Sequence, residues 1–192
     1  KVLRGHKFWL KSVALSIDGS LILSASADET LRLWDADTGE CLRSLDGPTK
    51  GVTQVALTSD GRIAITSSFD QMVRLWDTRT GQCIRSLEGH PGWVNCVVLS
   101  GDGRLALSGG NRHFFHPGGT LRLWDLATGH CVRAFDVCND ISCVALSIDG
   151  LWALSSDMRA ETIRVWNVTT GLCVRELEGH TGIVRALAFG AD

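Results

Sequence analysis

The chain has 192 residues, of which 44% are hydrophobic and 21% are charged, a composition typical of a globular protein with a substantial core. The formal net charge of −2 argues against a strongly basic nucleic-acid-binding or membrane-surface protein. No apolar run approaches the roughly 20 residues that a membrane helix needs, and no signal peptide opens the chain. We therefore expect neither nucleic acid nor a membrane as partner. Because the chain begins inside a repeat, we interpret it as part of a longer protein.

In chain order, the first repeat divides into four short strands. Its turn signals are Asp18-Gly19, Asp28 and Thr38-Gly39, and glycine supplies the positive φ that tight hairpin turns require. Strands of this length joined by such turns predict an antiparallel meander without helices. The expected strands are residues 11–16, 21–26, 30–35 and 41–45.

The same order of elements recurs three more times along the chain. Each third strand ends in a short stretch such as LRLWD, whose tryptophan is Trp34, Trp76, Trp124 or Trp166. A repeat of this length, within roughly 20–50 residues, indicates stacked or radially arranged units. The first strand of each repeat is apolar on both faces, so we expect it to be the innermost and most buried. The predicted blades are 11–46, 52–88, 94–136 and 141–178, with an outer strand at 1–4 and an inner strand at 183–189.

Two further dipeptides accompany the tryptophans. Asp follows Trp34, Trp76 and Trp124, Asn follows Trp166, and Gly-His pairs stand at Gly5-His6, Gly89-His90 and Gly179-His180. With these motifs in register, nearly the whole chain resembles the WD40 repeat family. That resemblance implies an all-β fold, a β-propeller of four complete four-stranded blades with partial strands at both ends. Family members generally form closed rings, most often of seven blades, so we expect part of a larger ring. The alternative is an oligomeric ring built from such chains.

In the family, a structural tetrad of Trp, Ser, His and Asp links three strands and a loop. His6, Ser24, Asp28 and Trp34 match this tetrad in the first repeat. Serine, histidine and aspartate also occur together in hydrolases, but a serine hydroxyl held by an indole inside a sheet is no exposed nucleophile. Neither a phosphate-binding loop nor a nucleophile elbow occurs elsewhere. We therefore expect no catalytic residue, no enzyme activity and no cofactor.

The other three repeats keep only part of the tetrad. Pro48 stands at the histidine position of the second repeat, an insertion displaces the aspartate of the third, and Asp157 of the fourth is out of register. Each lost hydrogen bond costs on the order of 1 kcal/mol, so we hypothesise that the first blade is the most rigid and the fourth the least. The retained members are Thr66, Asp70 and Trp76; His90, Ser108 and Trp124; and Ser155 and Trp166.

The insertion in the third repeat, GGNRHFFHPGG, is the most function-like segment of the sequence. In the family, this connection opens on the face that commonly receives partners. Phe114 and Phe115, beside Arg112, suit an interface anchor, or else fold back to cap their own blade. His113 and His116 could share a metal, but a site needs at least a third ligand, and we expect none.

Further candidates for binding a protein or peptide partner lie at equivalent positions near that face. Large aromatics encircling one end of a propeller would form a recognition ring; alternatively, the two tryptophans among them pack between neighbouring blades. The candidates are Trp9 and Trp93 after the Gly-His motifs; Lys11, Thr53, Asn95 and Ser142 at one shared strand position; and Phe69 and Arg159 in corresponding turns.

Six of the seven cysteines recur at two equivalent strand sites, Cys138 lies in an expected loop, and no CxxC pair occurs. Neighbouring repeats lie too far apart for the roughly 6 Å that a disulfide spans, so we interpret them as small buried thiols in a reducing cytoplasm. The sequence predicts a noncatalytic protein–protein interaction scaffold or sensing module of a larger multidomain protein. The alternative function is a self-assembling propeller fragment that closes a ring by oligomerisation.

Overall fold

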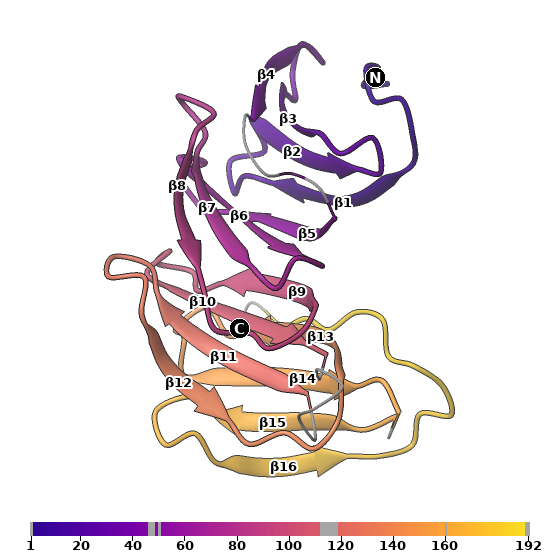
Figure 1. Cartoon of the computed structure of the whole chain (residues 1–192), viewed down its shortest axis with the longest axis vertical. Helices are drawn as coiled ribbons and strands as arrows, with labels where there is room; N and C mark the ends of the chain where they lie inside the picture. Colours follow the sequence, from indigo (N-terminus) through magenta and orange to yellow (C-terminus); the bar gives the residue numbers. More distant parts are fainter. Residues whose placement is uncertain (1, 46–48, 50, 112–118, 160, 191–192) are drawn as a thin grey trace.

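The computed structural model describes residues 2–45, 49, 51–111, 119–159 and 161–190 (Figure 1). It contains four separate four-stranded antiparallel sheets, each built from four consecutive strands. The described residues contain no helix, and hence none that could span a membrane. The all-β prediction is confirmed.

We call the four sheets blades one to four, in chain order. Blade one contains β1 (Leu10–Leu15), β2 (Leu21–Ser26), β3 (Leu31–Asp35) and β4 (Cys41–Leu45). Blade two contains β5 (Val52–Leu57), β6 (Ile63–Ser68), β7 (Val73–Asp77) and β8 (Cys83–Leu87). Blade three contains β9 (Val94–Leu99), β10 (Leu105–Gly110), β11 (Thr120–Asp125) and β12 (Cys131–Phe135). Blade four contains β13 (Ile141–Leu146), β14 (Trp152–Asp157), β15 (Ile163–Asn167) and β16 (Cys173–Leu177).

The turns between strands are held by side chains that the repeat supplies each time. In blade one, Asp18 accepts hydrogen bonds from the Ser16 hydroxyl at 2.6 Å and from the Ser20 backbone N–H at 3.0 Å. The Ser16 hydroxyl is the main cause that lowers the pKa of Asp18 to about 2. Gly19 follows at φ 74°, a left-handed conformation that glycine adopts without strain.

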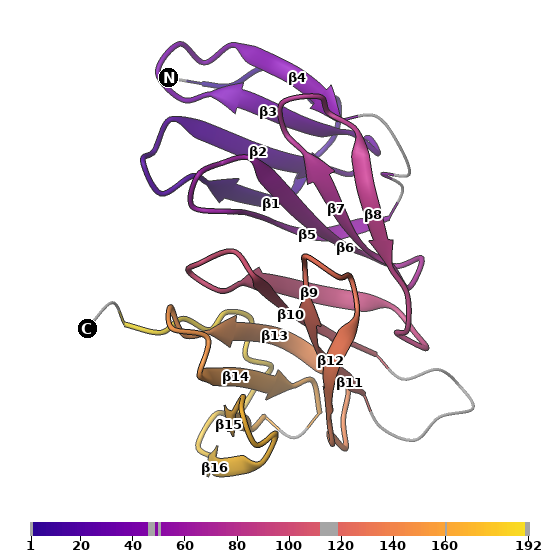
Figure 2. The same cartoon turned by 90° about the vertical axis from the view of Figure 1, so that its left-hand side faces the viewer.

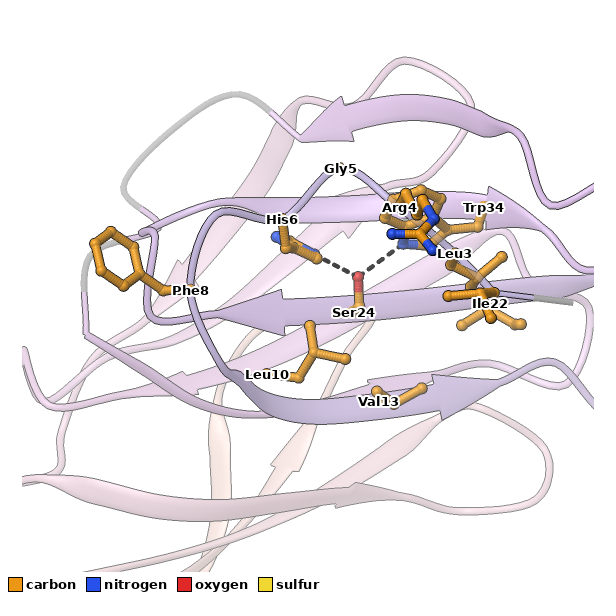
Figure 3. A pocket seen from close by; sticks show the side chains of 11 residues that line it. Leu3, Arg4, Gly5, His6, Phe8, Leu10, Val13, Ile22, Ser24 and Trp34 are labelled. Atoms are coloured by element: carbon orange, nitrogen blue, oxygen red, sulfur yellow. Dashed lines mark hydrogen bonds between the residues drawn. The ribbon is translucent and has the colours of Figure 1, made fainter.

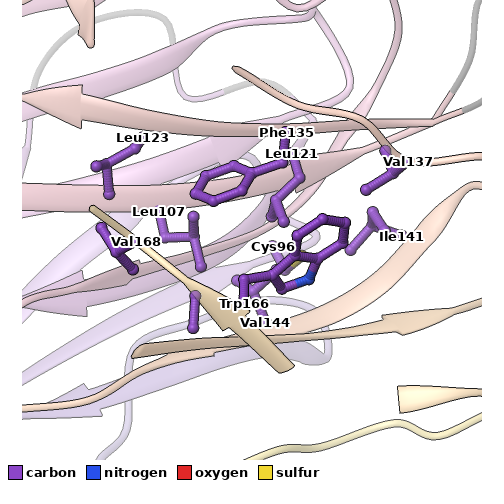
Figure 4. Packing of buried hydrophobic residues seen from close by; sticks show 11 residues of the cluster. Cys96, Leu107, Leu121, Leu123, Phe135, Val137, Ile141, Val144, Trp166 and Val168 are labelled. Carbon is purple, nitrogen blue, oxygen red and sulfur yellow. The ribbon is translucent and has the colours of Figure 1, made fainter. Parts of the chain in front are cut away.

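The blades pack face to face in an arc, as Figures 1 and 2 show. The inner strands β1, β5, β9 and β13 contact one another in turn, and the arc remains a partial propeller without a closed ring. Buried apolar side chains fill each of the three junctions between blades. Figure 4 shows the junction between blades three and four, where Trp166 lies with its ring centroid 5.5 Å from that of Phe135.

The expectation that the first strand of every repeat is the most buried is wrong in blades one, two and three, where the second strand has more buried residues, and the difference is largest in blade one. Leu10, Val13 and Leu15 of β1 are all more than half exposed, whereas β2 is buried along most of its length. A blade is buried on both faces only where it has a neighbour on each side, and blade one has a neighbour on one side only.

Two expected strands at the ends of the chain also differ from the structure. Residues 2–4 and 183–189 have no sheet partner and form no strand. A single extended segment without a neighbouring strand leaves its backbone hydrogen bonds unmade within any ladder. Residue 1 of the expected outer strand lies outside the described residues.

The cysteines are only partly buried. All seven thiols are free, and burial raises the pKa of Cys96 and Cys143 in the inner strands. Cys41, Cys138 and Cys173 are exposed, whereas Cys83 and Cys131, which also begin outer strands, are half-buried.

Candidate partner-binding face

The four tetrad residues of blade one lie together. The Trp34 indole N–H donates to the Ser24 hydroxyl at 2.7 Å, and His6 Nε2 shares a hydrogen bond of 2.7 Å with the same hydroxyl (Figure 3). His6 Nδ1 lies 3.0 Å from an oxygen of Asp28. Ser24 is buried within β2, so its hydroxyl is a structural link between strands and not an accessible nucleophile.

Asp28 completes this relay as a carboxylate. Burial opposes its ionisation, but hydrogen bonds from Thr30, from the Lys7 backbone N–H and from His6 outweigh burial and lower its pKa. The Lys7 N–H donates at 2.8 Å and the Thr30 hydroxyl at 2.7 Å. The relay therefore joins the N-terminal segment to the turn between β2 and β3.

Blade three repeats the relay with a different last member. Trp124 donates to Ser108 at 2.7 Å, and His90 Nε2 bonds Ser108 at 2.6 Å. His90 Nδ1 bonds the Thr120 hydroxyl at 2.6 Å, and Thr120 is the counterpart of Thr30, whose hydroxyl lies 3.1 Å from His6 Nδ1 in blade one. Burial, with a smaller contribution from the Arg122 charge, lowers the pKa of His90 to about 3.

In blades two and four, the third-strand arginine forms an ion pair with an aspartate, which was not among the sequence predictions. Their indoles still bond Thr66 and Ser155. In blade two, a terminal nitrogen of Arg74 lies 2.6 Å from an Asp70 oxygen.

In blade four, Arg164 pairs with the fully buried Asp157 at 2.5 Å and with Glu176 at 2.7 Å. Burial disfavours the charge of Arg164, but these two carboxylates outweigh it and raise the Arg164 pKa. The repeated third-strand arginine beside an acidic turn was the available sequence signal. Pro48 lies outside the described residues.

The shared strand position at Lys11, Thr53, Asn95 and Ser142 is a β-bulge in every blade. A bulge turns its extra residue away from the regular alternation, and three of these side chains reach the next segment of the arc. Thr53 donates to the Val94 carbonyl at 2.7 Å, Asn95 to the Ile141 carbonyl at 2.7 Å, and Ser142 to the Val184 carbonyl at 2.9 Å. These three side chains therefore link neighbouring segments as well as facing the inner side of the arc.

Lys11, at the same position in blade one, makes a different contact. Its ammonium lies 5.3 Å from the centre of the Phe69 ring, within cation–π range. The Phe69 ring lies 5.1 Å from that of Trp93. We call Lys11, Phe69 and Trp93 the aromatic rim; they come from blade one, the β6–β7 turn, and the segment that enters blade three.

The aromatic rim is open to solvent. Trp93 is 56% exposed and Phe69 is 43% exposed. Trp9, at the equivalent place before blade one, is 71% exposed, and its ring meets Phe8 edge-on at 6.1 Å. The two tryptophans are therefore exposed and are not packed between blades. Arg159 is exposed in the corresponding turn of blade four.

A groove of about 320 Å³ adjoins the rim through Lys11. The bulge residues line it together with Ser12, Gln54 and Arg185, and its described lining includes two cationic side chains and no acidic one. Gln54 and Arg185 were not among the predicted residues, although Gln54 follows the bulge residue Thr53 and Arg185 follows Gly179-His180 at the spacing of Asn95 after Gly89-His90. Within the described parts of the chain, no three His, Cys, Asp or Glu side chains converge as a metal site requires.

The predicted anchor in the insertion cannot be placed. It lies outside the described residues, and its members are Arg112, His113, Phe114, Phe115 and His116.

Comparison with known proteins identifies the repeat. The family model for WD40 (WD domain, G-beta repeat) matches residues 1–35, 39–77, 81–125 and 129–167. A probable E3 ubiquitin ligase complex SCF subunit sconB from Arthroderma benhamiae is 44% identical over 54 residues, which are 28% of this chain and 8% of that protein. WD repeat-containing protein 18 from Bos taurus is 50% identical over 50 residues, 25% of this chain and 12% of that protein. The human protein of the same name is 46% identical over 50 residues.

Proposed function

Because this chain belongs to the WD40 repeat family, we propose that it is a noncatalytic protein-interaction platform whose aromatic rim binds a protein or peptide partner. The family match supports a scaffold role in general, and the relatives are named as a complex subunit and as WD-repeat proteins. This chain covers 8% and 12% of the lengths of those relatives, so their activities as whole proteins do not transfer.

The observation that carries this proposal is the exposure of Phe69 and Trp93 in mutual contact beside Lys11. Tryptophan and other large aromatics dominate the energetics of protein interfaces, and contiguous exposed apolar surface marks interaction sites. The adjoining groove offers Lys11 and Arg185, so the expected partner presents an apolar side chain close to an acidic group.

Further parts of the proposal concern the whole protein, its location and its class of partner. We infer that the chain serves as a sensing or scaffolding part of a larger multidomain protein. The seven free thiols support a reducing, cytoplasmic location. The net charge of −2 supports protein, and not nucleic acid, as the partner.

The test compares partner capture by the wild-type chain and by a Trp93→Ala variant, with proteins identified by mass spectrometry after crosslinking. Ile84→Ala is the matched control, because Ile84 of β8 is exposed to a similar extent but lies on an outer strand. We expect specific partners to be lost from Trp93→Ala alone, with unchanged circular dichroism. Equal recovery in all three samples would remove the rim as a binding site. A Phe114→Ala, Phe115→Ala double variant tests the insertion in the same way.

A second function is supported by a different observation. The β1 face of blade one exposes several large apolar side chains in a row, which favours association. We propose that copies of the chain associate through the uncovered ends of the arc.

A further inference from the structure

We propose that the groove beside the aromatic rim binds a small phosphate-bearing molecule. The groove has a volume of about 320 Å³, and Lys11 and Arg185 are the charged residues of its described lining. Ligand pockets in proteins typically measure about 300 to 1,000 Å³, so the groove has room for a small ligand. This molecule is a ligand of the groove itself, beyond the protein or peptide partner proposed for the rim.

The groove is positively charged, although the whole chain has a formal net charge of −2. Its described lining carries two cations and no carboxylate. Within the described residues, neither Lys11 nor Arg185 forms an ion pair. Asp70, the carboxylate that follows the rim residue Phe69 in the sequence, is paired with Arg74. Charges of one sign along a cleft concentrate ions of the opposite sign there, so the groove favours an anionic ligand.

The bulge positions of the other blades show that Lys11 does not serve the same structural role. Thr53 and Asn95 each donate a hydrogen bond of 2.7 Å to a carbonyl of the next blade. Lys11 holds the equivalent position in blade one, but its ammonium lies over the Phe69 ring and bonds no carbonyl in the described residues of blade two. An ammonium has three N–H donors, and a cation–π contact is electrostatic. Lys11 therefore keeps donors for a ligand.

Two neutral side chains of the groove also have donors to offer. The Ser12 hydroxyl oxygen accepts a hydrogen bond of 3.1 Å from the Val55 N–H, and Gln54 Oε1 accepts one of 3.1 Å from the Val97 N–H. These bonds cross the junctions between blades, so they hold both side chains in place. Among the described residues, neither the Ser12 O–H nor the Gln54 NH₂ donates to an acceptor. Both groups line the groove and are available to a ligand oxygen.

This set of donors matches a phosphate monoester better than a carboxylate. A phosphate monoester carries a charge of roughly −1.5 to −2 at neutral pH and has three strong acceptor oxygens. Two cations and two neutral donors complement that charge and those oxygens, whereas a carboxylate would leave one cation without a partner. Arginine binds phosphate through its planar fork and lysine binds it as a point charge. The ligand and an acidic group of a rim partner would therefore compete for Lys11 and Arg185.

The experiment is a two-dimensional ¹H–¹⁵N NMR titration of the chain with sodium phosphate at constant ionic strength. The backbone amides of Val55 and Val97 are the reporters, because they are bonded to Ser12 and Gln54. We expect saturable shifts at both amides and at the Gln54 side-chain NH₂. Sodium acetate at the same ionic strength should bind at least about tenfold more weakly, because it has fewer charges and fewer acceptor oxygens. Glycerol 3-phosphate should cause the same shifts as phosphate.

Two variants test the assigned donors. Gln54→Glu keeps an oxygen acceptor for the Val97 N–H but replaces the free NH₂ by a negative charge, and Arg185→Gln removes one cation. We expect each variant to weaken phosphate binding by at least about tenfold, because charge-assisted hydrogen bonds are the strong ones. Arg104→Gln is the matched control, since Arg104 is an exposed arginine of the β9–β10 turn and does not line the groove. Unchanged circular dichroism shows that each variant is folded.

Several outcomes would overturn the phosphate site. These are an absence of saturable shifts at Val55 and Val97, equal affinity for acetate, and binding that both Gln54→Glu and Arg185→Gln leave unchanged. Shifts with inorganic phosphate but not with glycerol 3-phosphate would overturn a small-molecule ligand and leave an ion site only. Trp93→Ala should keep its phosphate affinity, because Trp93 does not line the groove. Phosphate binding and partner capture therefore test the groove and the rim separately.

Discussion

Blade one and blade three contain the same tryptophan–serine–histidine relay, but they end it differently. In blade one the histidine meets Asp28, a carboxylate that backbone and hydroxyl donors hold in its charged form. In blade three it meets the neutral hydroxyl of Thr120, and burial keeps His90 itself neutral. Both blades therefore keep the same tryptophan–serine–histidine contacts. The histidine meets a charged carboxylate only in blade one, where backbone and hydroxyl donors stabilise the ionised Asp28.

The two blades also differ in what covers their tryptophans. Both indoles are buried, but Trp124 packs in the cluster between blades two and three, whereas Trp34 borders a cavity that the N-terminal segment helps to line. We therefore expect Trp124→Ala to lower the free energy of unfolding by about 3–5 kcal/mol, and Trp34→Ala to lower it by less. Urea unfolding followed by circular dichroism measures both. Equal losses would mean that the preceding blade contributes nothing to the packing of the indole.

The two relays should also lose their contributions to the free energy of unfolding at different pH values. His90 has a folded-state pKa of about 3, below the ordinary value of about 6.5, so below pH 6.5 the unfolded chain binds a proton that the folded chain does not. Stability is then lost as pH falls, by about 1.4 kcal/mol per pH unit. The pKa of Asp28 is lowered from 3.8, so its contribution is complete above pH 3.8 and is lost only as pH falls below that value.

The measurement is the free energy of unfolding between pH 6.5 and 4.5 for wild type and His90→Gln. We expect the variant to be less stable at pH 7 but to lose less stability on acidification. If His90→Gln loses as much free energy of unfolding per pH unit as the wild type, His90 does not cause the pH dependence.

Removing the carboxylate from blade one sharpens the comparison further. Asp28→Thr leaves His6 Nδ1 with the Thr30 hydroxyl, the counterpart of Thr120 in blade three, and it leaves the Lys7 N–H without its carboxylate acceptor. We expect a loss of about 1–2 kcal/mol, because an unmade hydrogen bond to a charged group costs this much. Thermal and urea unfolding measure it, with Asp37→Thr as control since Asp37 is an exposed turn residue. An unchanged stability would make the carboxylate dispensable.

The smallest expected difference concerns blade one and blade four. The sequence hypothesis ranks blade one as more rigid because its tetrad is complete, and this stays a prediction. Amide hydrogen exchange should be slower in β2 than in β14. The contacts of Arg164 with Asp157 and Glu176 stabilise blade four, so we expect the difference in exchange rate between β2 and β14 to be small. Slower exchange in β14 than in β2 would contradict the ranking.

The repeat pattern in the sequence predicted the four sheets, and the resemblance to the WD40 family predicted the relay of blade one. Hairpins are determined by residues close together in the sequence. The Asp-Gly and Thr-Gly turns, and the tryptophan near the end of each third strand, are signals of this local kind. The Arg74–Asp70 and Arg164–Asp157 pairs were not predicted, because the tetrad pattern specifies a histidine at a fixed position. In both blades the aspartate is bonded by the guanidinium of the third-strand arginine.

Burial could not be predicted in the same way. The inner strands β1 and β5 have similar sequences, yet Val13 is exposed and Val55 is buried. What differs is the neighbouring blade, which no property of the strand itself reveals. The aromatic rim likewise depends on three segments that the arc brings together, so Trp93 could be nominated from its position but not placed beside Phe69.

Arg43 of β4 and Arg133 of β12 each donate a hydrogen bond to the Thr-Gly turn of the next blade. These contacts have a consequence for how repeat proteins of this kind evolve. The acceptors are backbone carbonyls, which every amino acid possesses, so drift in the turn's side chains does not remove them. Each unit also carries its own donor on one side and its own acceptor on the other. Gene duplication can therefore lengthen the array by whole units without requiring a new fastening to evolve.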